Sequence, residues 1–567
     1  MDLKTLNKYN LTQKKGKILK FLQDAEYYFD LALDYLDAED YLNALDYTRR
    51  AIKLDPYELD YIFLLAQIYS EMGLYAKSNF EYFKLLAIDQ NLGECYLRIS
   101  QNYYMMREEE AAVYYIKKSM EFDFDQDDFD EDEEFAVDYE EMLRDLSGNN
   151  KFRLISKNME DQMLLNYANK LMSISEYDSA MQLLSYVKPD SKYYINALNS
   201  AAFCSARIDN PEQEIELALK VLEIDPYNIN ALCNLADGYV QAGKVEEAQR
   251  VADALLQLKI ADTRDYYKAA IALLECGYNK QAIKYLCDFL SYHPYHEAGL
   301  LLLSLAYYNQ KELDLARECV YKLVRIDNTN TIAKYYNQYF QNHQEFKPLE
   351  YIRQVPKEEA DRRIKMFEEI VQYSSEDLIK LIKTNPEFFH YAKWIFEYAS
   401  IGLTQKLIER LARIRNQQAQ TFLRECLVDN LLSFVVKQRI LRTLLSLMPN
   451  KKIALVHEDE IRFITPKANK LIFNFPKVYF EAYLDVFTSL AFVDKDYESE
   501  FNRSVRKILN LCDAKKIRFR SRRNLAALFA YNFKRPEIFC DLNTVVKIFG
   551  ANKKSVAKYL NILGIDQ

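Results

Sequence analysis

The stretch INALCNLADGYVQAGKVEEAQRVADALLQLKIAD, residues 229–262, decides the fold of this chain. It places small residues at Ala236 and Ala248, an aromatic residue at Tyr239 and a glycine at Gly243. The same arrangement returns at a constant step along the chain, in units that begin at positions 161, 195, 229, 263 and 297. The other units carry Ala168 and Ala180 (from Asp161), Ala202 and Pro226 (from Ile195), Ala270, Gly277, Ala282 and Pro294 (from Thr263), and Tyr307 and Ala316 (from Glu297). Five units therefore share one phase.

A second run of the same pattern precedes these five units. It begins at Ala25 and carries Ala32, Tyr35, Ala44, Ala51 and Pro56, then Ala66, Tyr69 and Ser78, then Ser100, Tyr103 and Ala112. The alternative, an unrelated helical bundle, would not keep one fixed period over eight units. The sequence therefore predicts a repeat architecture.

The residues above resemble the tetratricopeptide repeat (TPR), a helix-turn-helix unit of about 34 residues with a small residue on each helix. The resemblance covers residues 25–124 and 161–330 and implies an all-α fold, a TPR α-solenoid in two arrays. Small side chains on both helices let the two axes approach closely. Proline cannot continue a helix, so Pro56, Pro226 and Pro294 are expected to act as helix stops.

Composition and patterning divide the chain into five predicted regions. They are an N-terminal TPR array (1–124), an acidic linker with a helical segment (125–160), a second TPR array (161–345), a helical middle domain without the repeat (346–514) and a basic tail (515–567). The alternating carboxylates and phenylalanines that lead into the linker favour a solvated segment. Near 452–465, β-branched residues on both sides of a polar run predict one small β-hairpin.

Several classes of function are disfavoured by the sequence. The N-terminus does not have the pattern of a secretory signal and no apolar run reaches about 18 residues, so we expect a cytoplasmic protein without a membrane partner. Nine scattered cysteines fit a reducing compartment. No phosphate-binding loop or catalytic motif is present, and His293 and His296 lack a third ligand nearby. We therefore expect no enzyme activity, no catalytic residue, no metal and no cofactor.

Repeat arrays of this kind bind an extended peptide or a helix along the concave face. In TPR modules that dock chaperones, asparagines and cations grip a terminal carboxylate, and that resemblance, carried over by phase, implies peptide-binding roles for Asn234, Arg264 and Lys268. The first pair of the pattern falls on Asn199 and Phe203, which departs from it. The alternative interpretation is a polar, hydrated face without a clamp.

The stretch DLNTVVKIFGANKKSVAKYLNIL, residues 541–563, predicts a helix-turn-helix. Val545 and Phe549 fall on one helical face, and Gly550 supplies the turn. It resembles the DNA-binding helix-turn-helix family, although Val546 stands where alanine is usual. On that resemblance the recognition helix begins with Asn552, Lys553, Lys554 and Ser555 and continues through Lys558.

Cations are concentrated in the predicted tail. Residues 515–567 hold twelve lysines and arginines against three carboxylates, a net charge of +9, whereas the whole chain carries −9. The predicted DNA-binding set therefore also includes Arg518, Arg520, Arg522 and Arg523. This segregation favours polyanion binding, and a helical cap that closes the solenoid is the alternative.

The first functional hypothesis is a non-catalytic scaffold or adaptor that binds a protein or peptide on its concave faces. The second is a TPR-containing transcription regulator that binds double-stranded DNA through its tail. In its parts the chain resembles bacterial TPR scaffold and regulator proteins, including peptide-sensing regulators of Gram-positive bacteria. Those regulators usually carry the DNA-binding domain first, whereas here the order is reversed.

Overall fold

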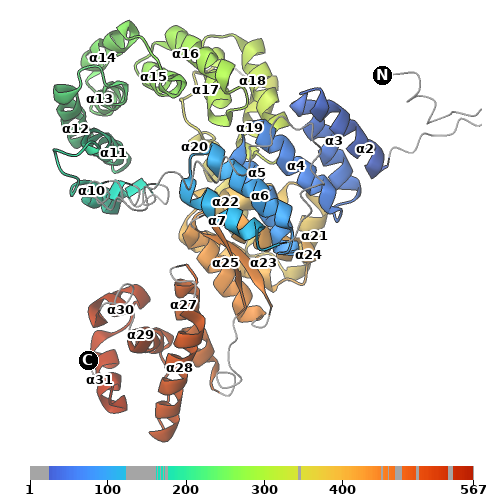
Figure 1. The fold of residues 1–567 in the computed structure, drawn as a ribbon, viewed down its shortest axis with the longest axis vertical. Helices are drawn as coiled ribbons and strands as arrows, with labels where there is room; N and C mark the ends of the chain where they lie inside the picture. The colour runs from blue at the N-terminus through green and yellow to red at the C-terminus, as the bar shows by residue number, and fades with distance from the viewer. Residues whose placement is uncertain are drawn as a thin grey trace, which may run out of the picture.

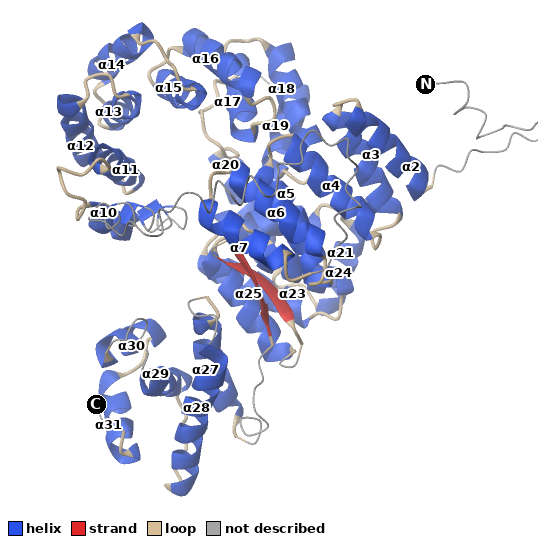
Figure 2. Cartoon of the chain, viewed as in Figure 1, coloured by secondary structure: helices blue, strands red, loops and turns tan. Residues whose placement is uncertain are grey.

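The computed structural model describes residues 24–122 and 161–565, except 162–163, 166–167, 170–171, 173–176, 343–345, 449–450, 458, 466–474, 493–496 and 534–540. Within this described part, all elements are helices except one two-stranded sheet (Figure 2). The predicted all-α fold class is therefore confirmed. The predicted acidic linker, 125–160, lies outside the described residues.

The first array is built from six helices. They are α2 (Ala25–Asp37), α3 (Tyr41–Leu54), α4 (Leu59–Glu71), α5 (Tyr75–Ile88), α6 (Gly93–Met105) and α7 (Glu109–Ser119). Consecutive helices form antiparallel pairs that match the three predicted units.

The second array forms an open arch (Figure 1). Its helices are α10 (Tyr177–Leu184), α11 (Tyr194–Arg207), α12 (Pro211–Ile224), α13 (Ile229–Gln241), α14 (Val245–Gln257), α15 (Thr263–Glu275), α16 (Asn279–Tyr292), α17 (Glu297–Asn309), α18 (Leu313–Ile326) and α19 (Thr331–Gln341). The first helix of each unit, α11, α13, α15 or α17, lies on the inner, concave side of the arch (Figure 1).

The small residues that define the repeat are buried at the contacts between helices. Fifteen predicted positions share an exposure of no more than 1%: Ala32, Ala44, Ala51, Ala66, Ser78, Ser100, Ala112, Ala168, Ala180, Ala202, Ala236, Ala248, Ala270, Ala282 and Ala316. Larger side chains there would push the two helices apart, which explains why the period is visible in the sequence.

The turn between the two helices of a unit contains one residue in the left-handed conformation. Seven described units place it at their fifteenth residue, as Gly73, Gly243 and Gly277 or as Glu39, Arg107, Asp209 and Lys311. A side chain costs roughly 1–2 kcal/mol in this conformation, whereas glycine adopts it freely. The backbone of the repeat therefore tolerates strain at four of its turns.

The first array folds back onto the far end of the second. The Arg49 guanidinium donates hydrogen bonds of 2.5 and 2.6 Å to the backbone oxygens of Arg325 and Ile326, at the end of α18. The Lys77 ammonium lies 2.5 Å from Asp327 and 3.4 Å from Glu297. Figure 1 shows the resulting contact between α3 and α18.

Six helices and the predicted hairpin follow the second array. They are α20 (Lys357–Ile370), α21 (Ser375–Thr384), α22 (Phe388–Tyr398), α23 (Ile401–Arg413), α24 (Gln417–Val428), α25 (Phe434–Leu447), β1 (Ile453–His457) and β2 (Glu460–Ile464). The strands pair antiparallel with Ile453 opposite Ile464, so the predicted hairpin is confirmed. The backbone N–H of Ile461 donates to the Tyr115 hydroxyl at 2.9 Å, so the hairpin packs on the first array.

The C-terminal part consists of α27 (Lys477–Leu490), α28 (Tyr497–Ala514), α29 (Arg522–Phe533), α30 (Leu542–Phe549) and α31 (Lys553–Leu563). Both α27 and α28 pack against α29 (Figure 1). The predicted boundary between residues 514 and 515 therefore falls inside a packed group of helices, because α28 packs against α27 before it and against α29 and α31 after it.

Candidate functional site

The loop that links α19 to α20 runs along the concave side of the second array beside α17 (Figure 2). We call its residues 346–356 the linking segment. The side-chain amide of Asn309, at the end of α17, donates to the backbone oxygen of Leu349 at 2.7 Å. The backbone N–H of Leu349 donates back to Asn309 Oδ1 at 2.8 Å. One asparagine thus pairs with both polar backbone groups of Leu349, in a segment that is neither helix nor strand.

Other contacts extend this attachment. The Tyr351 hydroxyl donates to Asn279 Oδ1 at 2.8 Å, and the Tyr351 ring packs against the core of the array. The Tyr336 hydroxyl donates to the backbone oxygen of Gln354 at 2.8 Å, while Trp394 Nε1 donates to its side chain at 2.9 Å. The concave face of the last repeats can therefore hold an extended chain, and it holds one of its own.

The residues predicted to form a carboxylate clamp already make hydrogen bonds or ion pairs within the chain. Asn234 donates to the backbone oxygen of Asn199 at 3.2 Å, and Lys268 Nζ lies 2.6 Å from Asn230 Oδ1. Arg264 pairs with Asp262 at 2.6 Å, and its hydrogen bonds lower the pKa of the Asp262 carboxyl to about 2. A carboxylate ligand would have to compete with Asp262 for this guanidinium.

Three carboxylates form a cluster on the concave side that the sequence analysis did not identify. Glu214 of α12, Asp237 of α13 and Glu275 of α15 make up this carboxylate cluster. Burial, the charges of Asp237 and Glu275 and a side-chain hydrogen bond with Asp237 raise the pKa of Glu214 to about 9. Burial and Asp237 raise the pKa of Glu275 to about 8. A signal was available in the sequence, because Glu214 stands one repeat length from Ala180 and one repeat length from Ala248.

In the basic tail, the helices α30 and α31 are joined by a three-residue turn. Gly550 adopts the left-handed conformation with φ of 58°, and Asn552 caps α31 by accepting from the backbone N–H of Ser555 at 2.9 Å. The apolar residues Val545 and Val556 are fully buried against α29 and its neighbours. Lys553, Lys554 and Lys558 are exposed.

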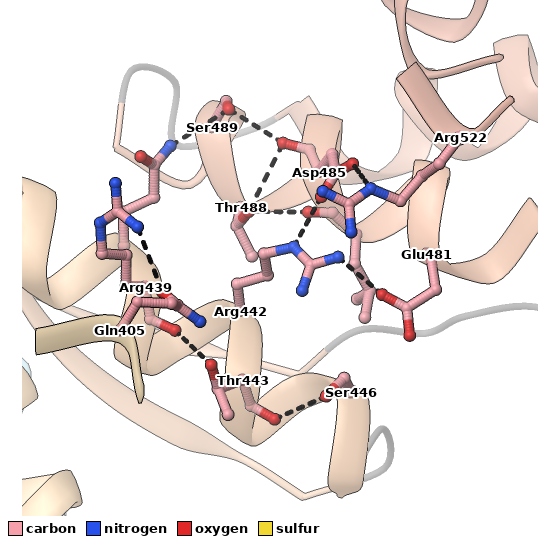
Figure 3. A network of polar contacts seen from close by, with 12 residues as sticks. Gln405, Arg439, Arg442, Thr443, Ser446, Glu481, Asp485, Thr488, Ser489 and Arg522 are labelled. Carbon is pink, nitrogen blue, oxygen red and sulfur yellow. Dashed lines mark hydrogen bonds and ion pairs between the residues drawn. The ribbon is translucent and has the colours of Figure 1, made fainter. Parts of the chain in front are cut away.

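Two of the predicted DNA-binding arginines are engaged within the chain. Arg518 lies 3.1 Å from Asp513, and Arg522 lies 2.8 Å from Asp485. Arg442 of α25 contacts the same Asp485 at 2.6 Å and also reaches Glu481 (Figure 3). Arg442 therefore joins α25 to the C-terminal helices, whereas Arg522 joins α29 to α27 within them.

Arg520 and Arg523 are exposed, like the lysines of α31. Arg518 and Arg522 are exposed as well, so what distinguishes them among the predicted tail cations is their pairing with a carboxylate. We call Arg520, Arg523, Lys553, Lys554 and Lys558 the exposed basic set.

Across the described ranges, no group of three or more histidine, cysteine, aspartate or glutamate side chains is arranged to hold a metal ion. Among the described helices, none is both long enough and apolar enough to cross a bilayer.

The chain resembles known repeat proteins, although no family model matches it. It is 25% identical over 279 residues to the TPR repeat-containing protein YvcD of Bacillus subtilis, which covers 48% of this chain and 55% of the relative. It is 21% identical over 255 residues to DnaJ homolog subfamily C member 3 of Mus musculus, covering 42% of this chain and 47% of the relative. The chain thus spans about half the length of these curated relatives.

Among solved structures, the APC/C hetero-tetramer Cut9-Hcn1 matches with a TM-score of 0.28 and 12% identity, over 74% of this chain and 96% of that one. The repeated helical pairs make this chain a helical-repeat protein, and over about half its length it is similar to the TPR repeat-containing protein YvcD.

Proposed function

We propose that this chain is a non-catalytic scaffold or adaptor that binds an extended peptide or protein segment on the concave face of its second array. The observation that carries this proposal is the double hydrogen bond between Asn309 and the backbone of Leu349. Both bonds are made to backbone atoms, so the same geometry suits an extended segment of any sequence. We further propose that it acts in the cytoplasm without a cofactor.

The next repeats offer similar groups to a partner. All four residues are on inner helices: Asn199 and Asn234 are half-buried, Lys268 is exposed, and Phe203 is 40% exposed. Amide side chains of this kind provide a donor and an acceptor at each repeat, and Phe203 offers apolar area. An extended partner would therefore continue from the linking segment toward α11.

An affinity purification with matched variants tests the proposal. The full chain serves as bait in a lysate of its own organism, beside a concave variant, Asn234→Ala with Lys268→Ala, and a control on the outer helices, Gln249→Ala with Lys220→Ala. We expect a captured protein to be lost with the concave variant and kept with the control. Identical capture by all three baits would contradict the proposal.

A second candidate function, DNA binding, rests on the exposed basic set. Lys553 and Lys554 open α31 directly after the capping Asn552, where side chains of a recognition helix would meet a major groove. A chromatin pull-down from the same cells tests this candidate, and we expect enrichment of duplex DNA that is lost when Lys553 and Lys554 are replaced by alanine.

A further inference from the structure

The basic character of the C-terminal part begins one helix before the predicted tail. Residues 503–523 hold nine lysines and arginines against a single carboxylate, that of Asp513. Three of these cations, Arg503, Arg506 and Lys507, belong to α28, and all three side chains are exposed. We call them the α28 cations. Their spacing of i, i+3 and i+4 places them on one face of the helix.

Packing fixes the direction in which this face points. The opposite face of α28 is buried, with five residues that are each at most 1% exposed: Phe501, Val505, Ile508, Leu509 and Cys512. On one flank, Asn502 accepts a hydrogen bond from the Tyr483 hydroxyl of α27 at 3.0 Å. On the other, Ser504 Oγ accepts one from the Asn532 amide of α29 at 2.7 Å. The α28 cations therefore point away from α27 and α29, into solvent.

The α28 cations lack the counter-charges that are common on other exposed helix faces. Elsewhere in the described chain, surface cations pair with a carboxylate one turn away, as Lys220 does with Glu216 at 2.6 Å. Arg506 and Lys507 have no acidic residue three or four positions away on either side. No ion pair joins any α28 cation to a described carboxylate. Like charges one turn apart destabilise a helix, and a bound polyanion removes this repulsion.

The α28 cations and the exposed basic set belong to one packed group of helices. The Lys515 ammonium, one residue beyond α28, donates to the backbone oxygen of Ile562 at 2.6 Å, so the carboxyl ends of α28 and α31 meet. Figure 1 shows both helices in this C-terminal group. A rigid partner that meets α31 therefore has α28 beside it.

We propose that the α28 cations bind backbone phosphates of double-stranded DNA, next to the place where α31 would enter a groove. This inference rests on the second candidate function and adds to it a contact that carries no sequence information. Arginine forks and lysine ammonium groups are the usual donors to phosphate oxygens. A duplex is a stiff rod with phosphates along its whole length, so it continues past α31 to the neighbouring helix, whereas a small anion would stay at one of them.

Titration of the full chain with a labelled duplex of about 30 base pairs, roughly 100 Å long, tests the inference. The variant combines Arg503→Ala, Arg506→Ala and Lys507→Ala. Each lost phosphate contact should reduce the slope of log affinity against log salt by about 0.9, so the slope should fall by roughly 2.7. The preference among duplex sequences should stay unchanged, because these contacts reach no base.

A control variant of equal charge combines Lys220→Ala, Arg250→Ala and Arg413→Ala. Each of these cations already pairs with a carboxylate one turn away, and the control should keep the salt slope of the wild type. A second variant, Arg503→Lys with Arg506→Lys, preserves the charge and should keep most of the slope. Circular dichroism confirms that the helices of each variant are intact.

A wild-type salt slope in the triple alanine variant would overturn the inference and leave the second candidate function standing. Absence of duplex binding by the wild type at low salt would overturn both. Sedimentation with vesicles of phosphatidylserine and phosphatidylcholine provides a further test. If the triple alanine variant loses vesicle binding and keeps duplex binding, the α28 cations face a membrane surface and the inference is wrong.

Discussion

Asn309 pairs with Leu349 through two hydrogen bonds, of 2.7 and 2.8 Å, and so fixes the linking segment on the concave face. The segment connects the second array to α20, so this contact also sets how the array is joined to the middle domain. On the part of the concave face beside Asn309, the linking segment therefore occupies the place that a bound partner would take.

Replacement of Asn309 by alanine should release the linking segment near Leu349. Each lost hydrogen bond contributes about 0.5–1.5 kcal/mol, so amide exchange around Leu349 should become roughly tenfold faster. Hydrogen exchange with mass spectrometry measures this rate. Asn91→Ala, in an exposed loop of the first array, is the matched control. Unchanged protection around Leu349 in the Asn309 variant would contradict the role given to the amide.

Replacement of Asp327 by asparagine should loosen the docking of the first array. Burial opposes ionisation, yet the Lys77 ammonium at 2.5 Å holds the pKa of Asp327 well below its usual value. The substitution leaves Lys77 with Glu297 alone, at 3.4 Å, so the loss should be about 1.5–3 kcal/mol, the contribution of a hydrogen bond to a charged group. Small-angle scattering should show a larger radius of gyration. Asp314→Asn, on the exposed side of α18, should leave it unchanged.

The same pair predicts a pH dependence. A carboxyl whose pKa is depressed in the folded state stabilises that state above its unfolded pKa, near 3.9, and the contribution is lost as the pH falls below that value. The melting temperature of the wild type should therefore fall toward that of Asp327→Asn as the pH is lowered from about 5 to 2. A constant difference across this range would show that the ion pair is not what stabilises the contact.

Much of the fold could be predicted from sequence because the repeat leaves a periodic trace. Residues such as Ala236 and Ala248 have small counterparts in the other units, and each is buried where the pattern requires it. The docking of the first array could not be predicted, since Lys77 and Asp327 lie 250 residues apart and belong to no period. The carboxylate cluster was missed for another reason. Glu214 breaks the pattern of small residues, and a comparison that looks for agreement between units passes over a single departure from it.

Glycine at a strained turn should stabilise the arrays. Arg107 has a φ of 63° at the position where other units carry glycine. Arg107→Gly should relieve roughly 1–2 kcal/mol of backbone strain, against about 0.5–1 kcal/mol of added entropy in the unfolded chain. We expect a small rise in melting temperature. Gly243→Ala should lower it, although a Cβ there would meet no atom within 4 Å. A lower melting temperature for Arg107→Gly, or a higher one for Gly243→Ala, would contradict the strain argument.

The exposed basic set should bind duplex DNA through two separable contributions if the second candidate function is correct. Replacement of Lys553 and Lys554 by alanine should reduce sequence preference, since these side chains open the helix that would enter the groove. Replacement of Arg520 and Arg523 should weaken binding to all duplexes alike and make affinity less dependent on salt, because fewer phosphates are neutralised. Titration of the full chain with duplex at several salt concentrations measures both effects.

Arg522→Ala is the control variant for these measurements. Because Arg522 pairs with Asp485, its replacement should lower the thermal stability and change the salt dependence of binding little. Absence of binding at low salt would leave α30 and α31 as a helical cap.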